Sequence, residues 1–477
     1  MKIRLQLFIF LLVTTNTIIA QCYSKIVSYN RQYYALQTDG TLWYKGFNFQ
    51  NYFGLGHSNV IPDFVQFGTD NDWTNQIAQS GSFTLAIKTD GTLWAWGKVI
   101  SPASGIETTS EEFQQPIQVG NENNWAKIVT SGLHTLAIKT DGTLWVWGNN
   151  DGGRFGIPSF PINVNTSTPL QVGTDNDWQE VFTCLWSRIS CAIKTNGTLW
   201  TWGGNGVRIG YSNATINDAY RSPHQIGTDT WKTAVVGGSG GSPSSVTFGI
   251  KTDGTLWCWG ATGGLTGTYF FGNGIEHYSS EIPEQIGTAN DWEKIASSDY
   301  TTVGLKTNGT CWGWGKNSNY QLGLGQGNNT NVGFPTQMGT DNDWETITLV
   351  DGVYTSFLGI KNNNSIYYSG LNHLNTLATT SALLSESTCD LSINEYDKTL
   401  FTAYPNPFTD SITFQINEPI NDFELQIINQ LGQVIYKKHN SNSQVNFSID
   451  TSLLTQGIYY ATISNNKTNY TVKLFKH

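Results

Sequence analysis

The hydrophobic and polar positions of this chain recur in one pattern along most of its length. Each unit contains four short runs rich in Ile, Val, Leu, Thr and Trp, which read approximately W-x-K-I, HTLAIK, GTLWxWG and PxQxG. Turn residues separate the runs, as expected for antiparallel strands. Apolar and polar residues alternate imperfectly in TLAIK and TLWAW, which favours sheets covered on both faces by neighbouring sheets. Each unit therefore predicts one small four-stranded sheet.

The turn between the second and third runs shows how often the unit recurs. Successive turn positions lie 51 to 57 residues apart, at Gly40, Gly91, Gly142, Gly197, Gly254, Gly309 and, in a degenerate seventh copy, Asn364. A fixed period in this range is typical of a solenoid, a propeller or an array of repeats. Because seven small sheets around an axis make a propeller, we predict an all-β fold with a closed seven-bladed β-propeller.

Two features of the repeated phrase have structural interpretations. Aspartate precedes the turn glycine in some units, as at Asp90, and asparagine in others, as at Asn196. Both dipeptides favour a hairpin turn with positive φ, so this position requires a backbone shape rather than a negative charge. The two tryptophans that follow lie two residues apart, on one face of a strand, and are expected to fill the wedge between blades; carbohydrate stacking is the alternative. Lys45 and Ser369 replace the second tryptophan in the first and seventh units, so the junction between these blades is expected to differ.

Composition and the first residues indicate an exported protein. Only 13% of residues are charged, the net charge is -10 and no block of Lys or Arg occurs, which argues against nucleic acid and anionic membrane as partners. Lys2, Arg4 and the apolar run 5–13 predict a signal peptide over residues 1–20. The alternative, an anchoring helix, requires a longer apolar run, and no other segment is suited to span a membrane.

Export implies an oxidising compartment, in which the six cysteines can form disulfides. We predict a disulfide between Cys22 and Cys389, because these residues bracket the repeats and ring closure brings the ends of the array together. Cys184 and Cys191 are a candidate second pair. Cys258 and Cys311 lie in neighbouring blades and are expected to stay reduced.

The units resemble the regulator of chromosome condensation repeat family, whose pattern runs through a DG hairpin, a tryptophan-glycine pair and a downstream GxLGxG. That tail is present here as FGLG at residues 53–56 and NYQLGLGQG at residues 319–327, and the resemblance covers residues 22–377. It implies a seven-bladed propeller. The founding activity of the family, nucleotide exchange on a nuclear GTPase, is not expected of an exported chain. Secreted bacterial members include propeller-shaped β-lactamase inhibitors.

The composition changes after the repeats. We assign the propeller to residues 21–378, a closing segment and linker to 379–402, and a small β-sandwich to 403–477. The last segment resembles the type A C-terminal sorting domain of the Bacteroidetes type IX secretion system. Its motif positions are Tyr404, Pro405, Asn406, Pro407, Phe408, Gly432, Gly457 and Lys473. The resemblance implies handling by the type IX machinery and a product that is secreted or attached to the outer-membrane surface; a second binding module is the alternative.

Motifs for catalysis and metal binding are weak. GGSGG around Ser239 has the letters of a nucleophile elbow but not the strand and helix that the elbow needs. The Asp-x-Asp of GTDNDW supplies too few ligands for calcium and is interpreted as a turn. The histidines and cysteines have no zinc-ligand spacing, so we expect no catalytic residue, metal or cofactor.

We therefore expect a monomeric binding protein that presents the variable loops after each WxWG to a protein or glycan. The candidate residues are Phe49, Tyr52, Phe113, Arg154, Phe155, Arg208, Tyr211, Tyr269, Phe270, Phe271 and Tyr320. The alternative for the aromatics is that some tuck beneath their own loops. The alternatives for function are a carbohydrate-active or other hydrolytic enzyme with its site at the channel mouth, and an inhibitor of an extracellular enzyme.

Overall fold

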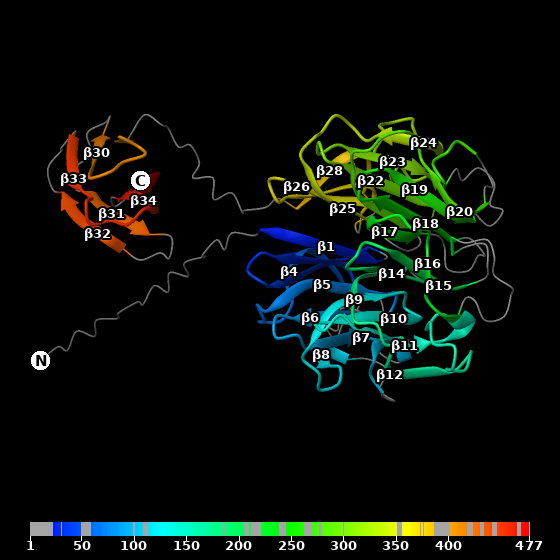
Figure 1. Ribbon diagram of the computed structural model, residues 1–477. Coiled ribbons are helices and arrows are strands. Elements are labelled where there is room, and N and C mark those ends of the chain that lie inside the picture. Colours follow the sequence, from blue (N-terminus) through cyan, green and yellow to red (C-terminus); the bar gives the residue numbers. More distant parts are fainter. Residues whose placement is uncertain are drawn as a thin grey trace, which may run out of the picture. The chain divides into compact units, whose positions relative to one another are not determined.

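The computed structural model divides the chain into two compact units, one of residues 21–387 and one of residues 388–477 together with 1–20 (Figure 1). The structure describes residues 22–29, 31–48, 59–98, 101–107, 113–184, 187–204, 209–210, 221–237, 245–261, 270–275, 279–298, 300–350, 355–372, 374, 376–385, 401–416, 423–429, 434–440, 446–464 and 469–476. The signal peptide expected over residues 1–20 lies outside this part of the chain.

In the described part of the first unit, seven four-stranded antiparallel sheets follow one another, each a meander of four consecutive strands (Figure 1). The first three sheets are β1 (Tyr23–Tyr29), β2 (Gln32–Gln37), β3 (Leu42–Phe47) and β4 (Val60–Gln66); β5 (Trp73–Gln79), β6 (Phe83–Lys88), β7 (Leu93–Gly97) and β8 (Phe113–Gln118); β9 (Trp125–Thr130), β10 (His134–Lys139), β11 (Leu144–Asn149) and β12 (Asn165–Gln171). The next two are β13 (Trp178–Phe182), β14 (Ile189–Lys194), β15 (Leu199–Gly203) and β16 (His224–Gln225); β17 (Trp231–Gly237), β18 (Ser245–Lys251), β19 (Leu256–Ala261) and β20 (Ser279–Gln285). The last two are β21 (Trp292–Ser298), β22 (Thr301–Lys306), β23 (Cys311–Gly315) and β24 (Val332–Gln337); β25 (Trp344–Val350), β26 (Ser356–Lys361), β27 (Ile366–Leu371) and β28 (Leu377–Ser385). Short 3-10 helices, η2 (Pro102–Ser104) and η3 (Asp151–Gly153), follow β7 and β11.

The seven sheets close into a ring. A hydrophobic core lies between each pair of successive sheets. One further core joins the first sheet to the seventh, through residues such as Tyr23 and Ile26 on one side and Leu358 and Ile360 on the other. The first strands of neighbouring sheets lie beside one another all the way round, and each is an edge strand, so these strands line the central channel. The predicted seven-bladed propeller is therefore confirmed.

Packing between blades explains why the hairpin turn uses glycine. Gly91 has a φ of 80°, and a Cβ atom there would lie 2.2 Å from the backbone oxygen of Asn123, which leads into the next blade. The neighbouring Asp90 accepts hydrogen bonds from the backbone N and the Oγ1 of Thr92, at 2.9 and 2.6 Å. Asn196 accepts the equivalent pair of bonds from the threonine two residues on, so this position does not require a charge.

The two tryptophans of each phrase have different surroundings. The second fills the space between blades, and Trp96, Trp147, Trp202, Trp259 and Trp314 are fully buried. The first is half-buried and covers the lysine at the end of the second strand. In the second blade, Lys88 Nζ lies 4.8 Å from the ring centroid of Trp73 and 4.9 Å from that of Trp94.

Acids of the GTDNDW turn hold this lysine from the other side. Lys88 Nζ lies 2.8 Å from Asp70 and 3.1 Å from Asp72. The same stack of lysine, two aromatic rings and one or two acids recurs at Lys194, Lys306 and Lys361. The repeated acids thus neutralise a buried cation, which agrees with their interpretation as structural turn residues.

The junction between the first and seventh blades differs from the others, as expected, and so does the junction between the sixth and seventh blades, which was not predicted. Lys45 replaces a tryptophan at the junction between the first and seventh blades, where its Nζ donates to the backbone oxygen of Leu384 at 3.2 Å. Burial lowers the pKa of Lys45, and the charge of Asp63 acts in the opposite direction. Ser369 is the replacement on the other side, and its Oγ donates to the backbone oxygen of Gln321 in the sixth blade at 2.8 Å. The segment assigned to closure and linker begins within β28, which is the outer strand of the seventh blade.

The second unit contains two antiparallel sheets. One has the order β29 (Phe401–Tyr404), β30 (Ser411–Ile416) and β33 (Asn446–Asp450). The other has the order β32 (Val434–Asn440), β31 (Phe423–Asn429), β34 (Gly457–Ser464) and β35 (Asn469–Lys476). Buried side chains from both sheets, among them Phe414, Ile427 and Leu474, form one shared core. This arrangement is the small β domain predicted for the end of the chain.

Candidate binding site

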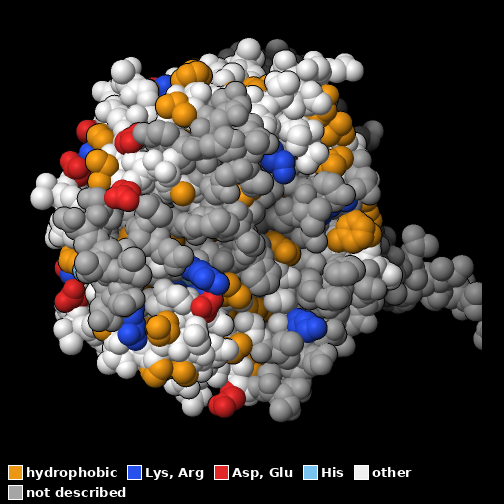
Figure 2. Space-filling model, turned by 90° about the vertical axis from the view of Figure 1, so that its right-hand side faces the viewer, with side chains coloured by type: hydrophobic (Ala, Val, Ile, Leu, Met, Phe, Trp, Pro, Cys, Tyr) orange, Lys and Arg blue, Asp and Glu red, His pale blue; other side chains and the backbone are white. Residues whose placement is uncertain are grey.

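The two ends of the propeller carry different connections. At one end, here called the turn end, lie the hairpin turns such as residues 90–91 and the GTDNDW turns. The third strand of each blade runs away from these turns, so the variable connections to the fourth strands lie at the opposite end, the loop end. Figure 2 shows this side of the molecule, where the described hydrophobic side chains are scattered in small groups rather than gathered into one patch.

Four of the candidate loop residues are buried. Arg154 is 1% exposed, and Phe155, Phe270 and Phe271 are 0% exposed. Phe270 contacts Phe248 at a ring-centroid distance of 5.6 Å, inside the core between the fifth and sixth blades. These four side chains therefore tuck beneath their loops. The prediction that they contact a ligand at the surface is wrong for these four residues.

Arg154 stabilises the junction between the third and fourth blades. Its Nε donates to the backbone oxygen of Asp151 at 2.7 Å. Its own backbone oxygen accepts hydrogen bonds from Ser190 Oγ at 2.9 Å and from Trp202 Nε1 at 3.0 Å. An arginine in a variable loop can anchor a ligand, but here the long side chain folds back onto its own loop.

The remaining candidates are only partly described. Tyr320 is half-buried and has a φ of 57°. Phe113 begins β8 opposite Gly97. The others, Phe49, Tyr52, Arg208, Tyr211 and Tyr269, lie outside the described residues, as does Ser239. Their part in binding stays a prediction.

A pocket that the sequence did not indicate lies between the long loop after β23 and the seventh blade. Its volume is about 410 Å³, and it is lined by Gly323, Leu324, Asn328, Thr330, Val332, Thr336, Gln337, Gly339 and Thr380. The backbone N of Gly325 donates to the backbone oxygen of Thr379 at 2.8 Å, which ties the loop to β28. The lining contains amide and hydroxyl groups beside aliphatic ones and no charged side chain. Such a lining suits a neutral polar ligand.

The pocket lies at the junction where tryptophan is replaced. In the third blade, a Cβ atom on the loop residue Gly156 would lie 2.7 Å from Nε1 of Trp202. At the equivalent place, a Cβ atom on Gly323 would meet the small Ser369 side chain at 3.1 Å and the backbone nitrogen of Ser381 at 3.6 Å. The departure of the seventh unit from the WxWG pattern is a sequence signal for this junction, although the sequence prediction placed the change at the junction between the first and seventh blades.

The described cysteines and histidines show no catalytic or metal-binding arrangement. Cys184 and Cys191 are not disulfide-bonded, so the candidate second disulfide is not formed, and Cys258 and Cys311 are also not disulfide-bonded. Cys22 is not among the free cysteines, but Cys389 lies outside the described residues, so their pairing stays a prediction. Within the described ranges, no cluster of three His, Cys, Asp or Glu side chains is placed to hold a metal, and no helix has the length and apolar character to cross a membrane.

The C-terminal unit has its own surface features. In its motif, Tyr404 is 46% exposed, residues 405–407 are exposed and Phe408 is buried in the core. Gly457 begins β34 and Lys473 lies in β35, whereas Gly432 lies outside the described residues.

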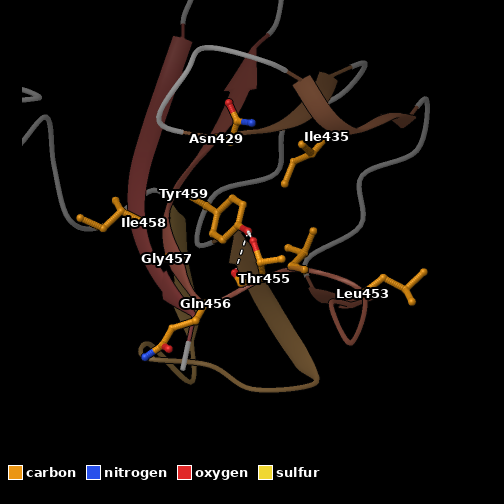
Figure 3. Close-up of a pocket in the computed structure, with 9 residues that line it drawn as sticks. Asn429, Ile435, Leu453, Thr455, Gln456, Gly457, Ile458 and Tyr459 are labelled. Atoms are coloured by element: carbon orange, nitrogen blue, oxygen red, sulfur yellow. Dashed lines mark hydrogen bonds between the residues drawn. The ribbon is translucent and has the colours of Figure 1, made fainter.

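A pocket of about 370 Å³ lies beside the beginning of β34 (Figure 3). Tyr459 donates its hydroxyl hydrogen to the backbone oxygen of Thr455 at 2.7 Å, and Leu453 points away into solvent with 96% of its surface exposed. An exposed leucine beside a pocket is a surface that a partner can cover.

Comparisons with known proteins agree with this geometry. Models of the regulator of chromosome condensation (RCC1) repeat match residues 125–154, 292–321 and 308–351. The model of the secretion system C-terminal sorting domain matches residues 402–477. Such a domain belongs to proteins that are secreted or attached to the outer-membrane surface.

Similar proteins share the propeller. The chain is 25% identical over 283 residues to the ultraviolet-B receptor UVR8 of Arabidopsis thaliana, covering 57% of this chain and 60% of the receptor. It is 26% identical over 276 residues to the human E3 ubiquitin-protein ligase HERC2, covering 56% of this chain and 5% of the ligase. It thus spans less than two thirds of these relatives.

Among solved structures, Prp20p of Saccharomyces cerevisiae has a TM-score of 0.60 at 16% identity, covering 74% of this chain and 87% of Prp20p. Human WBSCR16 has a TM-score of 0.59 at 18% identity, covering 72% of this chain and 88% of its own. The chain is therefore a seven-bladed propeller that contains RCC1 repeats and carries a secretion system C-terminal sorting domain.

Proposed function

We propose that the exported propeller is a binding protein rather than an enzyme, and that it recognises an extracellular protein or glycan. The observation that carries this proposal is the uncharged pocket between the sixth and seventh blades, held on a rigid ring. Hydroxyl and amide side chains at its wall can exchange hydrogen bonds with sugar hydroxyls or peptide groups. The variable loops at the loop end extend the surface available to a larger ligand.

Filling the pocket tests the proposal. Thr380 is exposed on β28 and lines the pocket, so Thr380→Trp is expected to weaken capture of the ligand at least tenfold in glycan-array and pull-down assays with extracellular material. Thr168→Trp places the same side chain on the outer strand of the third blade and serves as the control. Equal capture by both variants would contradict the assignment of the pocket.

Residues 403–477 act in this proposal as an address that the type IX machinery reads. The motif segment around Tyr404 and the surface around Leu453 support this role, because both are exposed on the C-terminal unit. The propeller has a complete set of cores of its own, so it is expected to fold without this unit.

A further inference from the structure

A second candidate site lies in the central channel. In the first strand of each blade, one residue directly precedes an apolar residue such as Ile26 or Ile128, and it occupies the same register in its sheet. Lys25 pairs with Leu36, Lys127 with Ile138, Glu180 with Ile193, and Lys294 with Leu305. Aligned on that apolar residue, the seven blades contribute Lys25, Gln76, Lys127, Glu180, Thr233, Lys294 and Thr346. These positions lie near the beginnings of the first strands, which follow the turns at the turn end. They therefore form one ring at the turn end of the channel.

The charged members of this ring lie close together although they come from different blades. Lys127 Nζ lies 2.6 Å from Glu180 Oε1. Lys294 Nζ donates to the backbone oxygen of Glu345, not to its carboxylate, at 2.6 Å. Lys25 interacts electrostatically with Glu180, Lys127 and Lys294, which belong to the fourth, third and sixth blades.

The positive charge of the ring exceeds what its carboxylate neutralises. Glu180 is the one acid of the seven aligned positions, and Glu345, the residue before Thr346 whose backbone oxygen Lys294 contacts, adds a second carboxylate beside the ring, against three lysines. A second ion pair, between Lys232 and Glu293 of adjacent blades, balances itself. Burial lowers the pKa of Lys25, Glu180 opposes this, and the charges of Lys127 and Lys294 lower it further. An additional anion among the three ammonium groups would relieve their repulsion.

Most positions beyond the ring are apolar. Two residues further along the first strands lie Val27, Val129, Phe182, Val235 and Ala296, which pack against the inter-blade cores, whereas the seventh blade has Thr348 at this position. Charges beside such an apolar surface interact more strongly than charges in bulk water, because the surrounding dielectric constant is lower.

We propose that the turn end of the channel binds a phosphate group between Lys25, Lys127 and Lys294. Three compact ammonium groups that approach from different blades match a multivalent tetrahedral oxyanion better than a single planar carboxylate. The group is either free inorganic phosphate or the phosphate of a phosphorylated sugar. This site is separate from the uncharged pocket between the sixth and seventh blades, so either proposal can fail without the other.

Calorimetric titration of the full chain with inorganic phosphate and with a sugar 1-phosphate tests the site. We expect Lys25→Gln and Lys294→Gln to weaken binding of both probes at least fivefold, and Glu180→Gln to strengthen it. The control, Lys98→Gln, removes the same charge at the loop end and is expected to leave binding unchanged. Tighter binding of the sugar phosphate would identify a phosphorylated glycan as the source, and equal binding would identify free phosphate.

Three results would overturn the proposal: no phosphate binding by the unmodified chain at millimolar concentration, unchanged binding by Lys25→Gln, or weaker binding by Glu180→Gln. Thermal unfolding of each variant separates loss of binding from loss of fold. Because Glu180→Gln is expected to gain affinity, a variant that merely misfolds cannot imitate the predicted pattern.

Discussion

Single residues of the repeat are fixed by how closely one blade approaches the next. A Cβ atom on Gly40, Gly91, Gly142, Gly254 or Gly309 would lie 2.0 to 2.2 Å from a backbone oxygen of the segment leading into the following blade. Asn364 occupies this turn in the seventh blade with a φ of 58°. Asparagine tolerates the left-handed region.

Gly91→Ala is therefore expected to destabilise the propeller by about 3 kcal/mol, because a positive φ and a backbone clash act together. Gly120→Ala is the matched control: Gly120 has a φ of 67°, but nothing lies within 4 Å of its added Cβ. We expect a loss of about 1 kcal/mol for this control from backbone strain alone. Chemical denaturation compares the two variants, and equal losses would show that the close approach of the blades is unimportant.

His134 gives the propeller an acid-sensitive point. It is fully buried between Ser131 and Ser190, whose Oγ atoms lie 2.8 and 2.9 Å from its ring nitrogens. Burial lowers the pKa of His134 well below its ordinary value of 6.5, and the charge of Arg154 acts in the same direction. The unfolded chain binds a proton here below pH 6.5 whereas the native chain does not, so the unfolding free energy falls as the pH falls through that value.

His134→Gln should remove part of this pH dependence, by about 1.4 kcal/mol per pH unit at most. His224→Gln, which changes a partly exposed histidine, should leave the dependence as it is. Denaturant midpoints between pH 7 and pH 5 measure the difference. An unchanged slope in His134→Gln would show that other groups carry the acid sensitivity.

In the second to seventh blades, the stack of lysine, aromatic rings and acids joins the second strand to the turn before the first strand, whereas the first blade has Gln37 in place of the lysine. Lys88→Ala should cost about 2 kcal/mol of stability, because it removes two cation–π contacts and leaves Asp70 and Asp72 beside each other. Lys98→Ala on the same hairpin should cost less than about 0.5 kcal/mol. A loss in Lys88→Ala no larger than that of Lys98→Ala would exclude a stabilising stack.

The elements and their order could be read from the sequence because each blade repeats the same strand and turn signals. The burial of Phe155 and Phe270 could not be predicted from the sequence. An aromatic residue in a loop can face either solvent or the next blade, and the sequence does not distinguish the two. The pocket beside Thr380 depends on residues from two blades, and the lysine ring depends on four. Such sites appear only after folding brings together residues from different blades.

The junction between the first and seventh blades closes the whole ring. The two blades do not exchange a strand there, because the first and seventh sheets are each built from consecutive strands. Side-chain packing, the hydrogen bond between Tyr23 and Ser385 at 3.2 Å and the predicted disulfide hold it. Cys22→Ser should therefore lower stability by about 4 kcal/mol in the chain-entropy model. Thermal unfolding with and without reductant tests this: reductant should destabilise the unmodified protein and leave Cys22→Ser unchanged.

At the scale of the whole molecule, the two units are expected to have separable roles. The sorting domain is a compact unit with its own core, and the seven inter-blade cores belong entirely to the propeller. Deletion of residues 403–477 in the native host should therefore leave a folded propeller in the periplasm, detectable by fractionation and by resistance to proteolysis. Leu453→Asp in the intact chain tests the exposed surface beside the pocket and should slow export, whereas Val65→Asp, an equally simple change on the propeller, should not. Normal appearance of the truncated protein outside the cell would show that the propeller carries its own export signal and that the C-terminal domain serves another purpose.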